Sequence, residues 1–119
     1  MLTIYHNPRC SKSREALTLV QQFGAEHEVP VQVVEYLQTP LTLEQLSALQ
    51  RQLGVPVRAM VRDTESEFDS LQLAQADEPA LLQALADCPK LMQRPIVSYR
   101  GQALIGRPPA PLAEWLQAR

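Results

Sequence analysis

A cysteine lies where a short apolar run gives way to a helical pattern. Cys10 follows an expected strand at 2–5 and directly precedes Ser11, where the helical period begins. The first backbone N–H groups of a helix have no partner within it and carry partial positive charge, so they favour an anion. Nearby cations add to this effect: Arg9, Lys12 and Arg14. The segment therefore predicts a thiol held as the thiolate, which is the nucleophilic form.

The alternative for Cys10 is burial as a small apolar side chain, the usual environment of a free cysteine. Its polar and charged neighbours make such a site unfavourable, so we interpret Cys10 as a catalytic nucleophile. His6 is either a base or electrostatic neighbour of this thiol, or simply a hydrogen-bonded loop residue. We assign supporting roles to Asn7, which with Pro8 ends the strand, and to Arg14.

Ser13 completes a C-x-x-S motif. In a C-x-x-C pair the second thiol resolves a mixed disulfide within the same chain, and a hydroxyl cannot do so. An external thiol is therefore expected to resolve any adduct of Cys10. The alternative for Ser13 is helix capping or contact with solvent.

The second cysteine, Cys88, is far from Cys10 in the sequence, and the two form neither a C-x-x-C pair nor a zinc pattern. We therefore expect no metal site. Its spacing with Leu81 and Leu85 predicts a place on the apolar face of a helix. Structural packing is the favoured interpretation of Cys88, and a resolving thiol is the alternative.

Three further arginines stand in largely uncharged surroundings at the edges of expected elements. A guanidinium group matches the oxygens of a tetrahedral oxyanion and stays charged at every relevant pH. Together with helix N–H groups, three of them could hold a phosphate-like or arsenate-like anion against the sulfur, although each alone could be a solvated surface residue. These are Arg62, Arg94 and Arg107.

The chain has 119 residues and a net charge of −2. This length predicts one domain, 1–119, and the charge argues against nucleic acid or a membrane surface as a main partner. No apolar run approaches the roughly 20 residues that span a bilayer, and no signal peptide is recognised. We expect a cytoplasmic protein.

Hydrophobic periodicity predicts the order β-α-β, a helical insertion, then β-β-α. The first three elements form a parallel βαβ unit, with Gly24 as the expected left-handed cap of its helix. Thr42 with Gln45, and Asp77, are expected helix starts. Arg100-Gly101 suits a hairpin turn. The expected elements are 2–5, 11–23, 31–36, 42–54, 57–62, 77–88, 96–99, 103–105 and 112–117.

The chain resembles the glutaredoxin-coupled arsenate reductases, in particular the short members of that thioredoxin-like family. Four segments in the family's order carry the resemblance: 4–14, 57–62, 94–97 and 105–108. The resemblance implies an α/β thioredoxin-like fold, with a four-stranded mixed sheet and a helical insertion at about 41–90 within the single domain.

The resemblance also implies the roles of the site residues. Cys10 is the expected nucleophile that reduces arsenate, Pro95 is the expected cis-proline, and glutathione is the co-substrate, with glutaredoxin as protein partner and no bound cofactor. The oxyanion ligands implied are Arg62, Arg94 and Arg107. In the established reductases small residues often flank the cysteine, where this chain carries Arg9 and Lys12.

Two other functions are compatible with such a fold. A glutathione-dependent disulfide oxidoreductase is the enzymatic alternative, but redox glutaredoxins carry a small residue where this chain has Arg94 before the proline. An Spx-type transcription-regulating interaction protein is the non-enzymatic alternative, and such proteins commonly show the C-x-x-C motif that is absent here. A phosphatase-type reductase would use a C-x5-R loop, which the spacing of Cys10 and Arg14 does not provide.

Overall fold

The computed structural model describes residues 1–106 and 110–119. The chain divides into two compact units. The first unit combines residues 1–39 with residues 94–119, and the second comprises residues 40–93.

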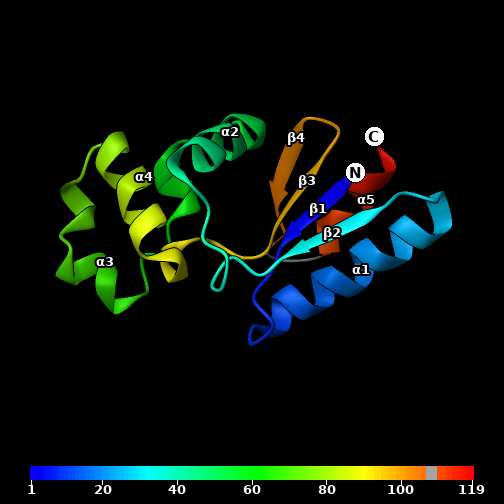
Figure 1. Cartoon of the computed structure of the whole chain (residues 1–119), viewed down its shortest axis with the longest axis horizontal. Coiled ribbons are helices and arrows are strands. Elements are labelled where there is room, and N and C mark those ends of the chain that lie inside the picture. Colours follow the sequence, from blue (N-terminus) through cyan, green and yellow to red (C-terminus); the bar gives the residue numbers. More distant parts are fainter. Residues whose placement is uncertain (107–109) are drawn as a thin grey trace. The chain divides into compact units, whose positions relative to one another are not determined.

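A four-stranded mixed sheet forms the centre of the first unit (Figure 1). Its strand order is β2-β1-β3-β4. β1 runs parallel to β2 and antiparallel to β3, and β3 and β4 form an antiparallel hairpin. The strands are β1 (Leu2–Tyr5), β2 (Val31–Val34), β3 (Ile96–Tyr99) and β4 (Gln102–Ile105). The parallel βαβ unit and the hairpin predicted from the sequence are thus confirmed.

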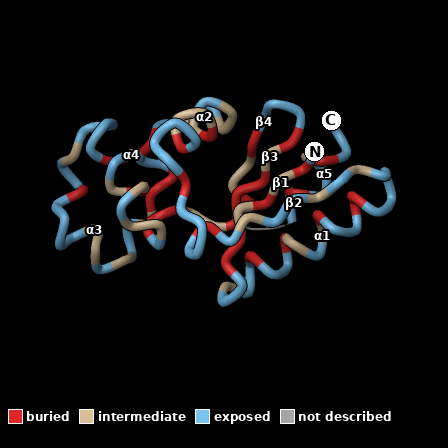
Figure 2. The backbone as a smooth tube through the Cα atoms, viewed as in Figure 1, coloured by how far each residue is buried: buried red, intermediate tan, exposed pale blue. Residues whose placement is uncertain are grey.

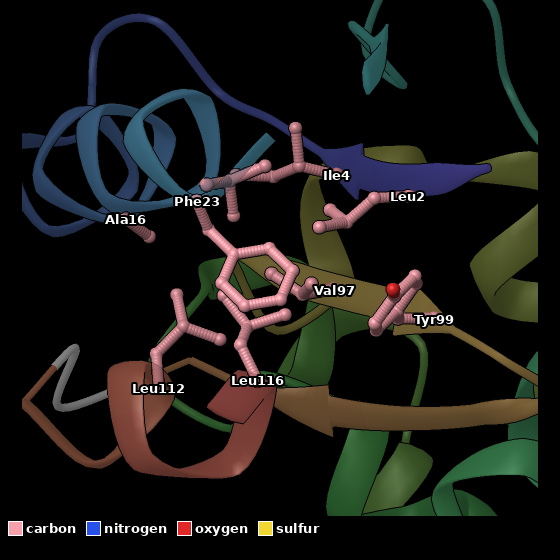
Figure 3. Close-up of a cluster of buried hydrophobic side chains, with 9 residues drawn as sticks. Leu2, Ile4, Ala16, Phe23, Val97, Tyr99, Leu112 and Leu116 are labelled. Carbon is pink, nitrogen blue, oxygen red and sulfur yellow. The ribbon is translucent and has the colours of Figure 1, made fainter. Parts of the chain in front are cut away.

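Two helices cover one face of this sheet, and the core of the unit lies between them and the strands (Figure 3). They are α1 (Ser11–His27) and α5 (Ala110–Gln117). Leu2 and Ile4 lie on the same face of β1, because side chains alternate along a strand. Buried residues lie along β1 and β3 and recur at intervals along α1 (Figure 2). The cluster comprises Leu2, Ile4, Ala16, Val20, Phe23, Val97, Tyr99, Leu112 and Leu116.

The end of α1 corrects one expectation. Gly24 lies inside the helix, and Glu28 is the cap, with a left-handed φ of 55°. A β-carbon at position 24 would lie 2.6 Å from Cγ2 of Val31 and 2.9 Å from the carbonyl oxygen of Val29. Glycine is therefore required there for the close approach of helix and strand rather than for its own backbone angles.

Two turns complete the first unit. Arg100 and Gly101 both have positive φ, 54° and 77°, which is the geometry of a tight two-residue hairpin turn. The expected strand 31–36 ends early, at Val34, and a turn follows in which the amides of Gln38 and Thr39 both donate to the carbonyl of Glu35. Tyr36, predicted within the strand, is fully buried in this turn.

The second unit is helical apart from an isolated bridge between Val61 and Met92. Thr42 and Gln45 form the predicted capping box, and the side chain of Asp77 accepts a hydrogen bond from the amide of Ala80. Its elements are α2 (Leu43–Leu53), η1 (Val57–Met60), α3 (Ser66–Ser70), η2 (Leu73–Gln75), α4 (Glu78–Asp87) and η3 (Pro89–Leu91).

Cys88 does not lie on the apolar face of a helix. α4 ends at Asp87, and Cys88 is a half-buried residue between α4 and η3. Proline at position 89 was expected to stop the helix, but the helical region already ends one residue earlier, because a residue that directly precedes a proline is disfavoured in the helical conformation. Among the described residues, no helix is both long enough and apolar enough to cross a bilayer.

Candidate functional site

Three segments of the first unit meet at one edge of its sheet. Tyr5 at the end of β1 lies opposite Ile96 at the start of β3, so the loop that begins with His6 and the Arg94–Pro95 pair leave the sheet at the same edge. Ile105 at the end of β4 also lies opposite Ile96. The amide of Gly106 donates to the carbonyl of Pro95 at 2.8 Å, which fixes the third segment.

Ser13 anchors the loop that carries the cysteine. It is completely buried, and its Oγ accepts a hydrogen bond from the backbone amide of Asn7 at 3.0 Å. Nδ1 of His6 lies 2.7 Å from the same oxygen. One hydroxyl from the first turn of α1 thus ties down two residues of the preceding loop.

Cys10 lies at the start of the 17-residue helix α1, as predicted. Its backbone amide donates to the carbonyl of Asn7 at 3.1 Å, and its own carbonyl accepts from the amide of Arg14 at 3.0 Å. Cys10 is half-buried and is not part of a disulfide. The backbone of Cys10 is therefore fixed while the residue remains partly exposed.

His6 is 5% exposed, and burial lowers its pKa. The carboxylate of Glu35 and the hydrogen bond with Ser13 act in the opposite direction but do not reverse the shift. The ring is therefore neutral at neutral pH. Oγ of Ser13 has two acceptor lone pairs and one proton, so it pairs with Nδ1 of His6 in either tautomer of the ring while it accepts from Asn7.

Asn7 and Arg14 both stabilise the loop conformation. Oδ1 of Asn7 accepts the amide of Arg9 at 3.0 Å, which closes a tight turn before the cysteine. Nη1 of Arg14 donates to the carbonyl of Pro8 at 2.9 Å. The supporting roles assigned to these residues thus have a structural basis in hydrogen bonds to the backbone of the loop.

The Arg94–Pro95 peptide bond is cis, as the resemblance implied. Pro95 is buried, and its ring contacts Gly106, where an added β-carbon would lie 3.3 Å from Cγ of the proline. Arg94 is half-buried directly before this bond. The structure therefore brings Arg94 and Pro95 to the same sheet edge as the cysteine loop.

The other two predicted arginines do not belong to the described part of the first unit. Arg62 belongs to the second unit, where its Nε lies 3.4 Å from Oε1 of Glu65 and its amide donates to the carbonyl of Leu91 at 2.6 Å. It directly follows the bridge between Val61 and Met92. Arg107 lies outside the described residues.

Sequence reasoning missed Glu35 and the turn that follows β2. β1 and β2 are parallel, and the amide of His6 donates to the carbonyl of Val34 at 2.8 Å, so Glu35 emerges beside the cysteine loop. The available signal was the position of Glu35 directly after a parallel strand, because ligands gather at the carboxyl ends of such strands. Across the residues described, no group of three or more His, Cys, Asp or Glu side chains could hold a metal ion.

Comparison with known proteins gives consistent matches. The model of the ArsC family matches residues 5–115. The chain is 48% identical to "Uncharacterized protein YfgD" of Escherichia coli (strain K12), over 93% of this chain and 92% of that protein. It is 43% identical to an arsenate reductase of Neisseria meningitidis serogroup A, over 90% and 91% of the two chains.

Among solved structures, an arsenate reductase from Vibrio cholerae has a TM-score of 0.85 and 45% sequence identity, with 95% of each chain covered. The fold described above is thus a thioredoxin-like α/β fold that solved relatives share over nearly their whole length.

Proposed function

The chain belongs to the ArsC family, and from this premise we propose that it is an enzyme that reduces arsenate to arsenite with external thiols. The observation that carries the proposal is the placement of Cys10. Its backbone is fixed at the start of α1 by a loop anchored on Ser13, beside a cis-proline and an arginine. This arrangement supplies a nucleophile and a cation at one edge of the sheet.

In the first step of the proposal, the thiolate of Cys10 attacks arsenic(V). A sulfur–arsenic bond forms, and one arsenic–oxygen bond breaks, with the oxygen leaving as water after protonation. Arg94 stabilises negative charge on the oxygens, and Arg62 and Arg107 are proposed to share this role. The first amides of α1 favour the attacking thiolate.

In the second step, the thiolate of glutathione attacks the sulfur of Cys10. A disulfide forms, and the electron pair of the sulfur–arsenic bond stays on arsenic, which leaves as arsenite. Arsenic gains two electrons, and two thiols become one disulfide. Glutaredoxin then attacks the glutathione sulfur of this mixed disulfide and restores the thiolate of Cys10.

The serine at position 13 supports the use of an outside thiol. Its side chain is buried, its oxygen is engaged by Asn7 and His6, and it cannot form a disulfide with Cys10. No second sulfur therefore lies at the position where redox C-x-x-C proteins carry their resolving thiol. We place the reaction in the cytoplasm, where reduced glutathione is available.

The test is arsenate-dependent oxidation of glutathione in the presence of glutaredoxin. We expect turnover by the wild type, loss of turnover in Cys10→Ser, and retained turnover in the matched variant Cys88→Ser. Equal turnover by wild type and Cys10→Ser would contradict the proposal.

The enzymatic alternative remains a glutathione-dependent disulfide oxidoreductase. The observation that favours it is a cis-proline at the same edge of the sheet as the loop that carries a half-buried cysteine, an arrangement that suits disulfide chemistry as well. Reduction of a glutathionylated peptide without arsenate turnover would select this alternative.

The non-enzymatic alternative is an Spx-type regulator, and the absence of C-x-x-C argues against it. Recovery of RNA polymerase together with the protein would support it.

A further inference from the structure

A hollow of about 290 Å³ lies beside the cysteine loop, within the first unit. One wall is the loop before Cys10, and the other is the turn after β2. The two walls are adjacent because β1 and β2 are parallel and the His6 amide is bonded to the Val34 carbonyl. The lining residues are Asn7, Pro8, Arg9, Glu35, Leu37 and Gln38.

Both walls have a fixed backbone. Asn7 holds the first wall through its side-chain bond to the amide of Arg9 and its carbonyl bond to the amide of Cys10. The carbonyl of Glu35 holds the second wall by accepting the amides of Gln38 and Thr39 at 2.9 and 3.0 Å. The hollow is thus formed by two closed turns rather than by extended loops.

The hollow offers opposite charges that no described residue pairs. Arg9 and Glu35 are both exposed, and among the described residues neither forms an ion pair. Gln38 adds a carboxamide, and Leu37, 41% exposed, adds an apolar surface. A guanidinium group binds a carboxylate, and a carboxylate binds an ammonium group. This combination suits a ligand that carries both charges.

We propose that this hollow binds the resolving thiol of the reaction, and that its ligand class is a small peptide thiol with a free ammonium and a free carboxylate at one end. This inference rests on the proposed function and assigns the second substrate to a site. The γ-glutamyl end of glutathione has this pair of charges on one carbon atom. Its carboxylate pairs with Arg9 and its ammonium with Glu35.

The position of the hollow fits the second step. Arg9 and Cys10 are neighbours in the chain, so their Cα atoms lie about 3.8 Å apart. A peptide held by its γ-glutamyl end beside the cysteine loop carries its thiol on the following residue, which is the residue that would face Cys10. Holding the thiol there replaces a bimolecular encounter by attack within a complex. The bond changes are those of the second step: a disulfide forms and arsenite leaves with the electron pair.

The kinetic test compares two thiols in the same reaction. Arsenate turnover is measured with glutathione and with 2-mercaptoethanol, which carries neither charge, for wild type, Arg9→Gln and Glu35→Gln. We expect the KM for glutathione to rise about three- to fivefold in each variant, the size expected for one exposed charge pair. Turnover with 2-mercaptoethanol and the KM for arsenate are expected to stay as in the wild type in Glu35→Gln. Because Arg9 also adds cationic charge near the thiolate, Arg9→Gln is judged by the ratio of the two KM values: that for glutathione rises relative to that for 2-mercaptoethanol, whereas a change in thiolate reactivity affects both thiols equally.

Matched controls remove the same charges elsewhere. Glu26→Gln on α1 and Arg51→Gln on α2 change exposed residues outside the hollow and are expected to leave both thiols unaffected. An equal rise for both thiols in Glu35→Gln would overturn the inference, because it would point to the electrostatic effect of Glu35 on His6. An unchanged KM for glutathione in both hollow variants would overturn it as well.

A binding experiment separates this inference from the proposed function. S-methylglutathione, which cannot react, is titrated into the isotopically labelled protein without arsenate. We expect saturable NMR shifts at the amides of Arg9 and Gln38 that weaken in Glu35→Gln. Wild-type protein that turns over arsenate with 2-mercaptoethanol but shows no such shifts would overturn the hollow alone. Shifts without any arsenate turnover would overturn the proposed function alone.

Discussion

Oγ of Ser13 lies 2.7 Å from Nδ1 of His6, and both side chains are buried. The same oxygen accepts the amide of Asn7, so the first turn of α1 and the loop before it share one hydrogen-bonding centre. The motif C-x-x-S thus does more than omit a second thiol. Its serine fixes the conformation in which the cysteine is presented.

Replacing this serine should destabilise the protein. In Ser13→Ala, the buried amide of Asn7 and Nδ1 of His6 lose their shared partner. We expect the free energy of unfolding to fall by about 1–3 kcal/mol, the cost of unsatisfied buried polar groups. Urea unfolding measures this. Ser11→Ala, at the exposed first position of α1, is the control and should change stability by less than about 0.5 kcal/mol. Equal effects of the two variants would contradict the anchoring role.

The buried histidine should make stability depend on pH below neutrality. Burial lowers the pKa of His6 in the folded protein, so between that pKa and the unfolded value the unfolded chain binds more protons. The free energy of unfolding should therefore decrease as pH falls through about 6.5, the ordinary pKa of histidine in an unfolded chain, and level off below the folded pKa. Unfolding in urea at pH 7.5 and pH 5.0 tests this.

A histidine variant isolates that effect. His6→Gln should show a smaller loss of stability between the two pH values than the wild type, whereas His27→Gln, at an exposed position, should behave like the wild type. If His6→Gln and the wild type lost the same stability, the titrating group would lie elsewhere.

The two cysteines should differ in reactivity although both are half-buried. Cys10 stands at the start of a long helix, beside cations, and Cys88 stands after the end of α4. Each single-cysteine variant leaves one thiol to react: Cys10 in Cys88→Ser and Cys88 in Cys10→Ser. At pH 6.5 we expect iodoacetamide to modify Cys10 about tenfold faster than Cys88, because the thiolate is the reacting form. Mass spectrometry over time gives both rates. Equal rates would show that the helix start does not activate the thiol.

Loss of the arginine before the cis-proline should affect arsenate rather than folding. We expect Arg94→Gln to lower kcat/KM for arsenate by about 100-fold, the size of a lost donor to a developing anion. Arg94→Lys should restore only part of the activity, since an ammonium group lacks the planar fork. The melting temperature of each variant is the control, and a loss of activity that follows a loss of folded protein would argue against a ligand role.

The contact of Gly24 with the start of β2 should outweigh helix propensity. Alanine favours a helix by up to about 1 kcal/mol over glycine. Its β-carbon would overlap Cγ2 of Val31 and the Val29 carbonyl, and such overpacking costs about 1–3 kcal/mol. Gly24→Ala should therefore lower the urea midpoint. Adding Val31→Ala should lessen the effect of the glycine substitution on the urea midpoint, because it removes the overlap with Cγ2 of Val31. An unchanged effect would assign the strain to the contact with the Val29 carbonyl.

Local signals in the sequence predicted much of the fold. The alternation in β1, the capping box at Thr42 and the turn at Arg100-Gly101 depend on neighbouring residues, and the structure confirms each. The end of α1 could not be predicted in this way. Gly24 suggested a cap, but the feature that requires glycine there is a contact with Val31, which is visible only once helix and strand have packed.

The candidate site was likewise predictable where it depends on neighbouring residues in the sequence, and not where it depends on packing. Cys10 could be recognised from its position between strand and helix, and the cis bond before Pro95 followed from the family resemblance. Glu35 escaped notice because its place beside the loop depends on the register of two parallel strands. The role of Ser13 as an anchor depends on hydrogen bonds across the loop, which the motif alone does not specify.

The buried serine also determines what limits the proposed enzyme in a cell. With no partner sulfur on its own helix, each catalytic cycle ends in a form that only fresh reductant can recycle. Arsenite output would then follow the ratio of reduced to oxidised small thiols, and under oxidative stress the protein would accumulate as the glutathionylated, resting species.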